Sequence, residues 1–150
     1  MKKGIILAAA VAVIGVAGAI GLTAVLAGGS GTSVKAEIRL QSNSVDPLAS
    51  GKAKSEQRTG TSSDRTRFSV EVEDVSSAGA HSVRILRGDP AVEIANSPVS
   101  VTVDALGFGE LELNTQDGAA NVPVAVVGDF VEVLNPNGVV ILSGTLVAKG

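Results

Sequence analysis

The chain has 150 residues, a net charge of −3, no cysteine, tryptophan or tyrosine, three phenylalanines and one histidine. The lack of cysteine excludes thiol chemistry and zinc–thiolate sites. Because aromatic platforms and a dense arginine cluster are missing, we expect no nucleic-acid partner.

Residues 1–27 form the first predicted element, a hydrophobic helix that targets the chain to a membrane. Lys2 and Lys3 precede an uncharged run that extends to Gly29. One interpretation is a signal peptide that is cut after Ala27, where small residues suit the peptidase. The other is a retained anchor, because about 20 apolar residues cross a bilayer. In both, the lysines keep the N-terminus inside, so we expect an extracellular or membrane-anchored domain, with the membrane as a partner through this helix.

A third interpretation concerns Lys3-Gly4, which resembles the cleavage site of type IV prepilins. In that family a peptidase cuts after the glycine, and the helix then packs into a filament. The family carries glutamate at the fifth mature position, where this chain has Ala9. The sequence therefore leaves three outcomes open for the segment, namely cleavage after Ala27, cleavage after Gly4, or retention.

The folded domain is expected over residues 34–150, after a flexible Gly/Ser linker at residues 28–33. Apolar and charged residues alternate over 34–40, which predicts a half-buried strand. Residues 52–58 also alternate, but their inward positions hold only small or polar side chains. We therefore expect residues 52–58 to form an edge strand, whose lysines discourage pairing with another chain.

The next predicted strand, residues 67–75, has one apolar face and one acidic face. The expected core side chains are Phe68, Val70 and Val72. Glu71 and Glu73 share the solvent face. If this strand forms a hairpin with residues 52–58, the acidic face lies near the basic residues of that strand, and each opposite-charge pair contributes about 0.2–1 kcal/mol. These basic residues are Lys52, Lys54 and Arg58.

The remainder of the chain predicts short antiparallel strands joined by turns. Glycine, proline and asparagine mark the turns, and no helical period occurs after the N-terminal segment. The predicted strand pairs are 82–86 with 91–95, 99–104 with 109–114, and 130–134 with 139–142, followed by a short final strand within 143–148. We therefore expect an all-β fold, an antiparallel β-sandwich or small barrel of about eight strands, preceded by one N-terminal hydrophobic helix.

Enzymatic activity is not expected from this sequence. His81 is the one histidine, and we expect it to be a polar residue at a strand edge rather than a catalytic base. The nucleophile-elbow pattern GxSxG is absent. Glu71 and Glu73, like Glu110 and Glu112, share a strand face, but sugar clefts usually offer aromatic rings, which this chain lacks.

We expect no cofactor from this sequence, and calcium is the one ion that the residue types would suit. Hard oxygen ligands on loops suffice for this ion. The candidate ligands are Asn114, Asp117, Asn121 and Asp129. Their spacing does not fit the EF-hand pattern, and Asp-Gly and Asn are equally expected as turn formers. Both interpretations of these residues stay open.

Five stretches within residues 50–146 share a pattern of strands and turns. They are SGKAKSEQR, RFSVEVEDVSSAGAHSV, GFGELELNTQDG, VPVAVVGDFVEV and NGVVILSGTL. In this pattern the chain resembles secreted bacterial β-sandwich modules, loosely the chordin-type (CHRD) family. That family shows a histidine-rich strand motif, where this chain has only His81. The resemblance therefore implies a fold and an extracellular setting, and no site residue.

Three functional hypotheses follow from the sequence. The first is an exported, non-catalytic β-sandwich module with a structural or binding role at the cell surface or outside the cell. The second is a filament subunit that assembles by donating residues 33–40 as a strand to a neighbour's sheet edge, which makes self-association possible. The third is a calcium-dependent binding module or a weak hydrolase.

Overall fold

The computed structural model describes residues 31–60 and 63–150. The predicted hydrophobic helix at 1–27 and its alternative cleavage sites lie outside these residues. Within the described ranges, no helix is long and apolar enough to cross a membrane. The helical element described there is one short 3-10 turn, η1, at Thr115–Asp117.

The described residues fold into β-strands that pair antiparallel throughout. The strands are β1 Thr32–Ser42, β2 Ser50–Thr59, β3 Arg65–Glu73, β4 Gly79–Arg87, β5 Val92–Glu93, β6 Val99–Val103, β7 Gly109–Asn114, β8 Phe130–Leu134, β9 Val140–Thr145 and β10 Val147–Ala148. The hairpins predicted for the second half of the chain are confirmed. β1 begins at Thr32, so the last two residues of the expected linker belong to this strand.

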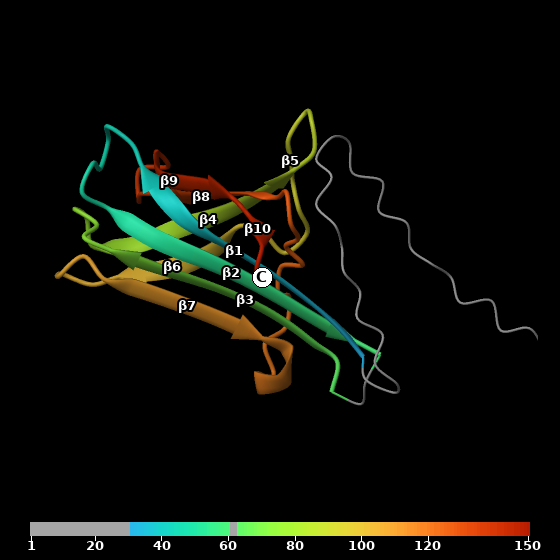
Figure 1. Cartoon of the computed structure of the whole chain (residues 1–150). Coiled ribbons are helices and arrows are strands. Elements are labelled where there is room, and N and C mark those ends of the chain that lie inside the picture. The colour runs from blue at the N-terminus through green and yellow to red at the C-terminus, as the bar shows by residue number, and fades with distance from the viewer. Residues whose placement is uncertain (1–30, 61–62) are drawn as a thin grey trace, which may run out of the picture.

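Eight of these strands close into a barrel. Their order is β1-β2-β3-β7-β6-β4-β8-β9, and β9 pairs again with β1. β10 adds to β1, and β5 adds to β4. Figure 1 shows the strands wrapped around a common interior. The all-β class is thus confirmed, and of the two expected architectures the chain forms the barrel.

The barrel interior is filled with aliphatic side chains. Strand alternation sends every second residue inward, and Phe68, Val70 and Val72 on β3 are fully buried, as predicted. An eight-stranded barrel is just wide enough for side chains to fill its interior. Phe68 is the largest of the side chains that are fully buried there.

The sharp reversal between β6 and β7 confirms the turn that was predicted from its glycines. Gly107 has φ of +83°, and an added Cβ there would lie 2.6 Å from the Val75 carbonyl oxygen. The Val75 N–H donates to the Gly107 carbonyl at 3.1 Å. Only glycine combines this conformation with so close an approach, so the turn also holds the loop that follows β3.

Residues 52–58 do not form an edge strand, so that prediction is wrong. They lie in β2, which pairs with β1 on one side and with β3 on the other. Two of its inward side chains are polar because they hold a loop. The Ser55 hydroxyl donates to the Ala125 carbonyl at 2.6 Å, and the Gln57 amide donates to the same oxygen at 3.0 Å. The segment before β8 therefore packs against β2 and fills the space that larger apolar side chains on β2 would take.

Candidate functional site

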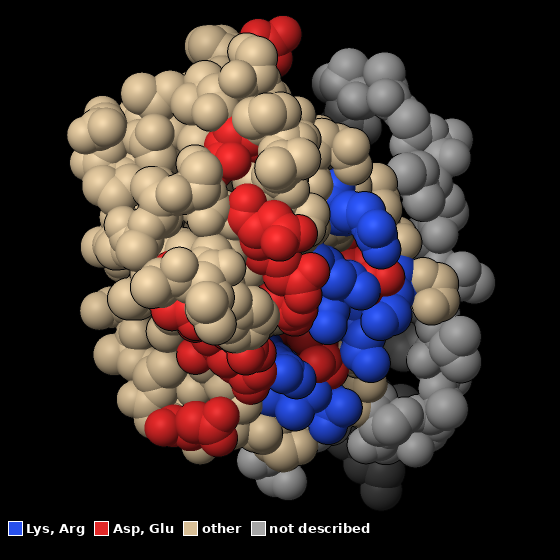
Figure 2. All heavy atoms as spheres, turned by 90° about the vertical axis from the view of Figure 1, so that its left-hand side faces the viewer, with Lys and Arg blue, Asp and Glu red and all other residues tan. Residues whose placement is uncertain are grey.

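Charged side chains gather on one part of the barrel's outer surface. Figure 2 shows lysine and arginine side chains together, beside a column of acidic side chains. A broad neighbouring area carries few charges. The basic cluster lies on the outer wall of β1, β2 and β3, and the acidic column includes residues of β3 and β7.

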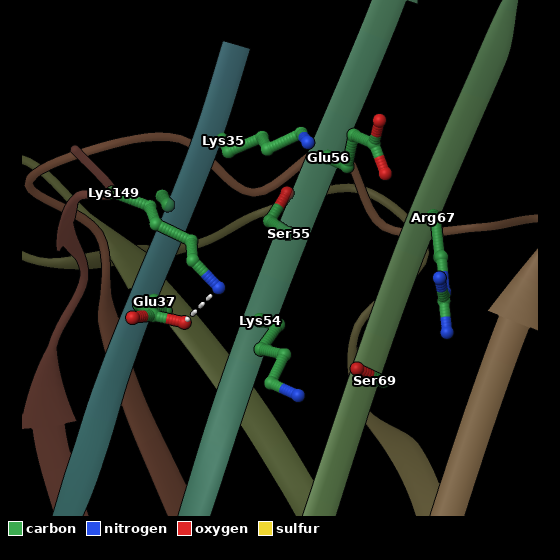
Figure 3. A pocket seen from close by; sticks show the side chains of 9 residues that line it. Lys35, Glu37, Lys54, Ser55, Glu56, Arg67, Ser69 and Lys149 are labelled. Atoms are coloured by element: carbon green, nitrogen blue, oxygen red, sulfur yellow. Dashed lines mark ion pairs between the residues drawn. The ribbon is translucent and has the colours of Figure 1, made fainter.

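A hollow of about 220 Å³ lies within the basic cluster. We call it the basic hollow. Six charged residues line it, from β1, β2, β3 and the segment after β10, and Figure 3 shows its four cationic side chains on different sides of the hollow. The charged residues are Lys35, Glu37, Lys54, Glu56, Arg67 and Lys149.

The pairing of β1, β2 and β3 places the side chains of the basic hollow in two rows that run across the three strands. The first row is Lys35, Glu56 and Arg67, and the second row is Glu37, Lys54 and Ser69. Alternation places both rows on the outer face. Lys149 joins them because β10 pairs with β1, and the Lys149 N–H donates to the Lys35 carbonyl at 3.0 Å. The C-terminal segment thus completes a site that begins on the first strand.

Both carboxylates of the basic hollow are paired with cations. Glu37 lies 3.2 Å from the Lys149 ammonium and 3.6 Å from that of Lys52. The hydrogen bond from Lys149 lowers the pKa of Glu37. Glu56 lies 2.6 Å from the Arg65 guanidinium. Burial opposes ionisation of Glu56, but the hydrogen bond and charge of Arg65 outweigh it, so the pKa of Glu56 lies below its ordinary value.

Replacing Glu56 with glutamine is expected to make stability less dependent on pH in acid. The folded-state pKa of Glu56 lies below the ordinary value of 4.5. The carboxylate therefore stabilises the wild type above the unfolded-state pKa, and this contribution disappears as the pH falls through the folded-state pKa. Thermal melting between about pH 3 and pH 7 should give two curves that converge at acid pH. Parallel curves would contradict this role.

The other cations of the basic hollow have unused hydrogen-bonding capacity. Among the described residues, the ammonium groups of Lys35 and Lys54 have no hydrogen bond or ion pair. Arg67 donates from one terminal nitrogen to Glu112 at 2.6 Å. A guanidinium carries five N–H donors, so Arg67 keeps further donors. Positive charge therefore remains in the basic hollow after its carboxylates are neutralised.

The basic residues of β2 do not neutralise the acidic column, although they were expected to lie beside it. β2 pairs with β3, as predicted, and Lys52 stands opposite Glu71 in this register. The Lys52 ammonium nevertheless contacts Glu37 on β1. Among the described residues, Glu71 and Glu73 form no ion pair with the basic residues of β2. Glu71 directly faces Glu110 across β3 and β7. Like charges at such positions repel, so Glu71 and Glu110 leave negative charge beside the basic hollow.

His81 does not lie exposed at a strand edge, so that prediction is wrong. It is fully buried, because the alternation of β4 places it on the inner face with Val83. Its Nδ1 lies 3.1 Å from the Gly79 carbonyl oxygen, and its Nε2 lies 3.3 Å from the Ser77 hydroxyl. Both ring nitrogens thus have partners nearby in the chain, one in the first residue of β4 and one in the loop before it.

The predicted calcium ligands fall into separate hydrogen-bonding groups. The Asn114 amide donates to Asp117 at 2.9 Å, and Asn114 also caps η1. Asp129 is buried, and both its oxygens accept hydrogen bonds from Arg87 at 2.7 Å. Asn121 has a positive φ of 59°. Within the described part of the chain, no three acidic or histidine side chains group as a metal site would require.

We expect calcium to leave the melting temperature unchanged. A metal bound only by the folded state raises the melting temperature, and a chelator reverses the effect. Asp129 would have to release Arg87 before it could coordinate an ion, and Asn114 and Asp117 already bond to each other. Melting curves with calcium and with EDTA should therefore coincide. A rise of several degrees with calcium, reversed by EDTA, would restore the calcium hypothesis.

Comparison with known protein families finds none that the chain matches, and comparison with curated proteins finds no significant relative. The resemblance to chordin-type modules therefore stays a prediction. The basic hollow was not predicted from the sequence. The alternation of charged residues on β1 and β2 could have indicated a charged outer face. Nothing in the sequence indicated that Lys149, at the other end of the chain, would join that face.

Proposed function

We propose that the protein is an exported, non-catalytic β-barrel module that binds a charged partner at the cell surface or outside the cell. The apolar segment behind Lys2 and Lys3 supports export. The observation that carries the binding role is the basic hollow, a recess on the outer wall whose cations exceed its carboxylates. Among the described residues, the barrel interior is filled with buried aliphatic side chains, whereas the basic hollow lies open on the outer wall.

Strand donation by residues 33–40 is the weaker alternative. In the structure these residues lie in β1, which pairs with β2, β9 and β10 of its own chain. Donation to a neighbour would require β1 to leave all three strands and open the barrel. No observation in the described residues favours that exchange over the intramolecular pairing.

Cell fractionation with intact-mass measurement in the native host tests export. We expect the protein outside the cytoplasm, with a mass that corresponds to cleavage after Ala27, cleavage after Gly4, or retention of the whole chain. A matched variant, Val13→Arg, places a charge within the apolar run and should accumulate in the cytoplasm. Full-length wild-type protein in the cytoplasm, with the same distribution as the variant, would overturn the export proposal.

A further inference from the structure

We propose that the basic hollow binds an oxyanion, namely a phosphate or sulfate group carried by a larger anionic ligand. This inference rests on the proposed binding function, because it names the ligand class of the same site. The shared chemistry of the two groups is a tetrahedral centre with several negatively charged oxygens. Such a group accepts hydrogen bonds from several cationic donors at once.

The charge distribution favours an anion at this position. Glu37 is neutralised by Lys149, and Glu56 by Arg65. Lys35 and Lys54 remain without an ion pair among the described residues. A bound anion would supply the missing negative charge between two rows that are already in place. It would need no rearrangement of the strands.

The size and donors of the basic hollow also fit an oxyanion. One water occupies about 30 Å³ in the liquid, so a hollow of about 220 Å³ holds a tetrahedral group together with several waters. Figure 3 shows Ser69 next to Lys54 on the neighbouring strand, with Arg67 beyond it. The Ser69 hydroxyl makes no hydrogen bond within the described residues and can donate to an oxygen.

The acidic column restricts how a polyanion can lie on the wall. Glu71 and Glu110 face each other directly beside the rows that build the basic hollow. The negative charges of these two carboxylates repel a chain of phosphates or sulfates. The ligand would therefore extend over β1 and β2, away from β7. This arrangement predicts a site for the end or one turn of a polyanion rather than a continuous groove.

Titration calorimetry at low salt tests the proposal on the protein as isolated from its native host. Tripolyphosphate is the phosphate probe and dextran sulfate is the sulfate probe, and saturable binding of one without the other identifies the group that the site prefers. Lys54→Glu should weaken binding of the preferred probe by about tenfold or more, because it places a negative charge in the second row. Added sodium chloride should weaken wild-type binding, since exposed charges are screened.

Arg39→Glu is the matched control. Arg39 is exposed on β1, lies outside the basic hollow, and its replacement changes the net charge by the same amount. We expect it to weaken binding by less than about threefold, because only the long-range field changes. Lys54→Gln removes the positive charge without adding a negative one. It keeps the test valid if Lys54→Glu does not fold. Circular dichroism should show that all three variants fold.

Three outcomes would overturn the oxyanion site. They are no binding of either probe by the wild type, an equal loss in Lys54→Glu and Arg39→Glu, and unchanged affinity in both Lys54 variants. Each of these leaves the export experiment untouched, since that experiment measures location and mass. Binding by a protein that stays in the cytoplasm would instead overturn export while it supports the oxyanion site.

Discussion

Replacing Phe68 with alanine is expected to lower the free energy of unfolding by about 3–5 kcal/mol. Phe68 is the largest side chain that is fully buried in the barrel. The substitution removes apolar contacts and leaves a cavity that strands on all sides cannot close, because their hydrogen-bonded pairing holds them apart. Urea denaturation, monitored by circular dichroism, measures the change.

Phe108→Ala is the matched control for this experiment. Phe108 lies in the turn between β6 and β7, and 42% of it is exposed. The same chemical change should therefore cost only about 1–2 kcal/mol, since much of the ring is already in solvent and no enclosed cavity forms. Equal losses for the two variants would mean that β3 does not form the centre of the core, and the barrel packing described above would be wrong.

Replacing Arg87 with alanine should lower the free energy of unfolding by about 2–4 kcal/mol. Its guanidinium donates to both oxygens of Asp129, which is 1% exposed, and also to the Val124 carbonyl at 2.9 Å. The same hydrogen bonds raise the pKa of Arg87, so it is charged at any ordinary pH. Without Arg87, a buried carboxylate lacks its counter-ion. The guanidinium is half exposed, so the loss stays below that of a fully buried pair.

Two further variants identify the cause of that loss. Arg67→Ala breaks an ion pair in which both side chains are about 40% exposed, and it should cost about 1 kcal/mol or less. Adding Asp129→Asn to Arg87→Ala should recover part of the stability, because no uncompensated charge then remains buried. A double variant that is less stable than Arg87→Ala alone would show that the carboxylate acts mainly through its bond with the Val126 N–H.

Much of the local structure could be predicted because it depends on near neighbours in the chain. Alternation in β3 assigns Phe68 to the core and Glu71 to solvent without knowledge of the partner strands. The turn between β8 and β9 follows from Asn-Pro-Asn-Gly, since Gly138 takes the positive φ that this turn requires. These features needed no information about the rest of the fold.

The errors arose where a residue's partner lies far away in the sequence. Polar inner residues on β2 indicated an edge strand, but Ser55 is polar because it holds the Ala125 carbonyl. The basic residues of β2 were expected to neutralise the acidic face of β3, yet the Lys52 ammonium contacts Glu37 on the other neighbouring strand. In each case the alternation was interpreted correctly and the partner was not.

The sequence by itself determined the strand faces, the turns, the all-β class and the apolar segment that predicts export. Tertiary structure alone decided that β9 returns to β1 and closes a barrel, that Asp129 binds Arg87, and that Lys149 completes the basic hollow. The physical reason is that a period of two residues specifies which way a side chain points but not which strand lies beside it. Strand partners depend on how all the inward side chains fill one interior together.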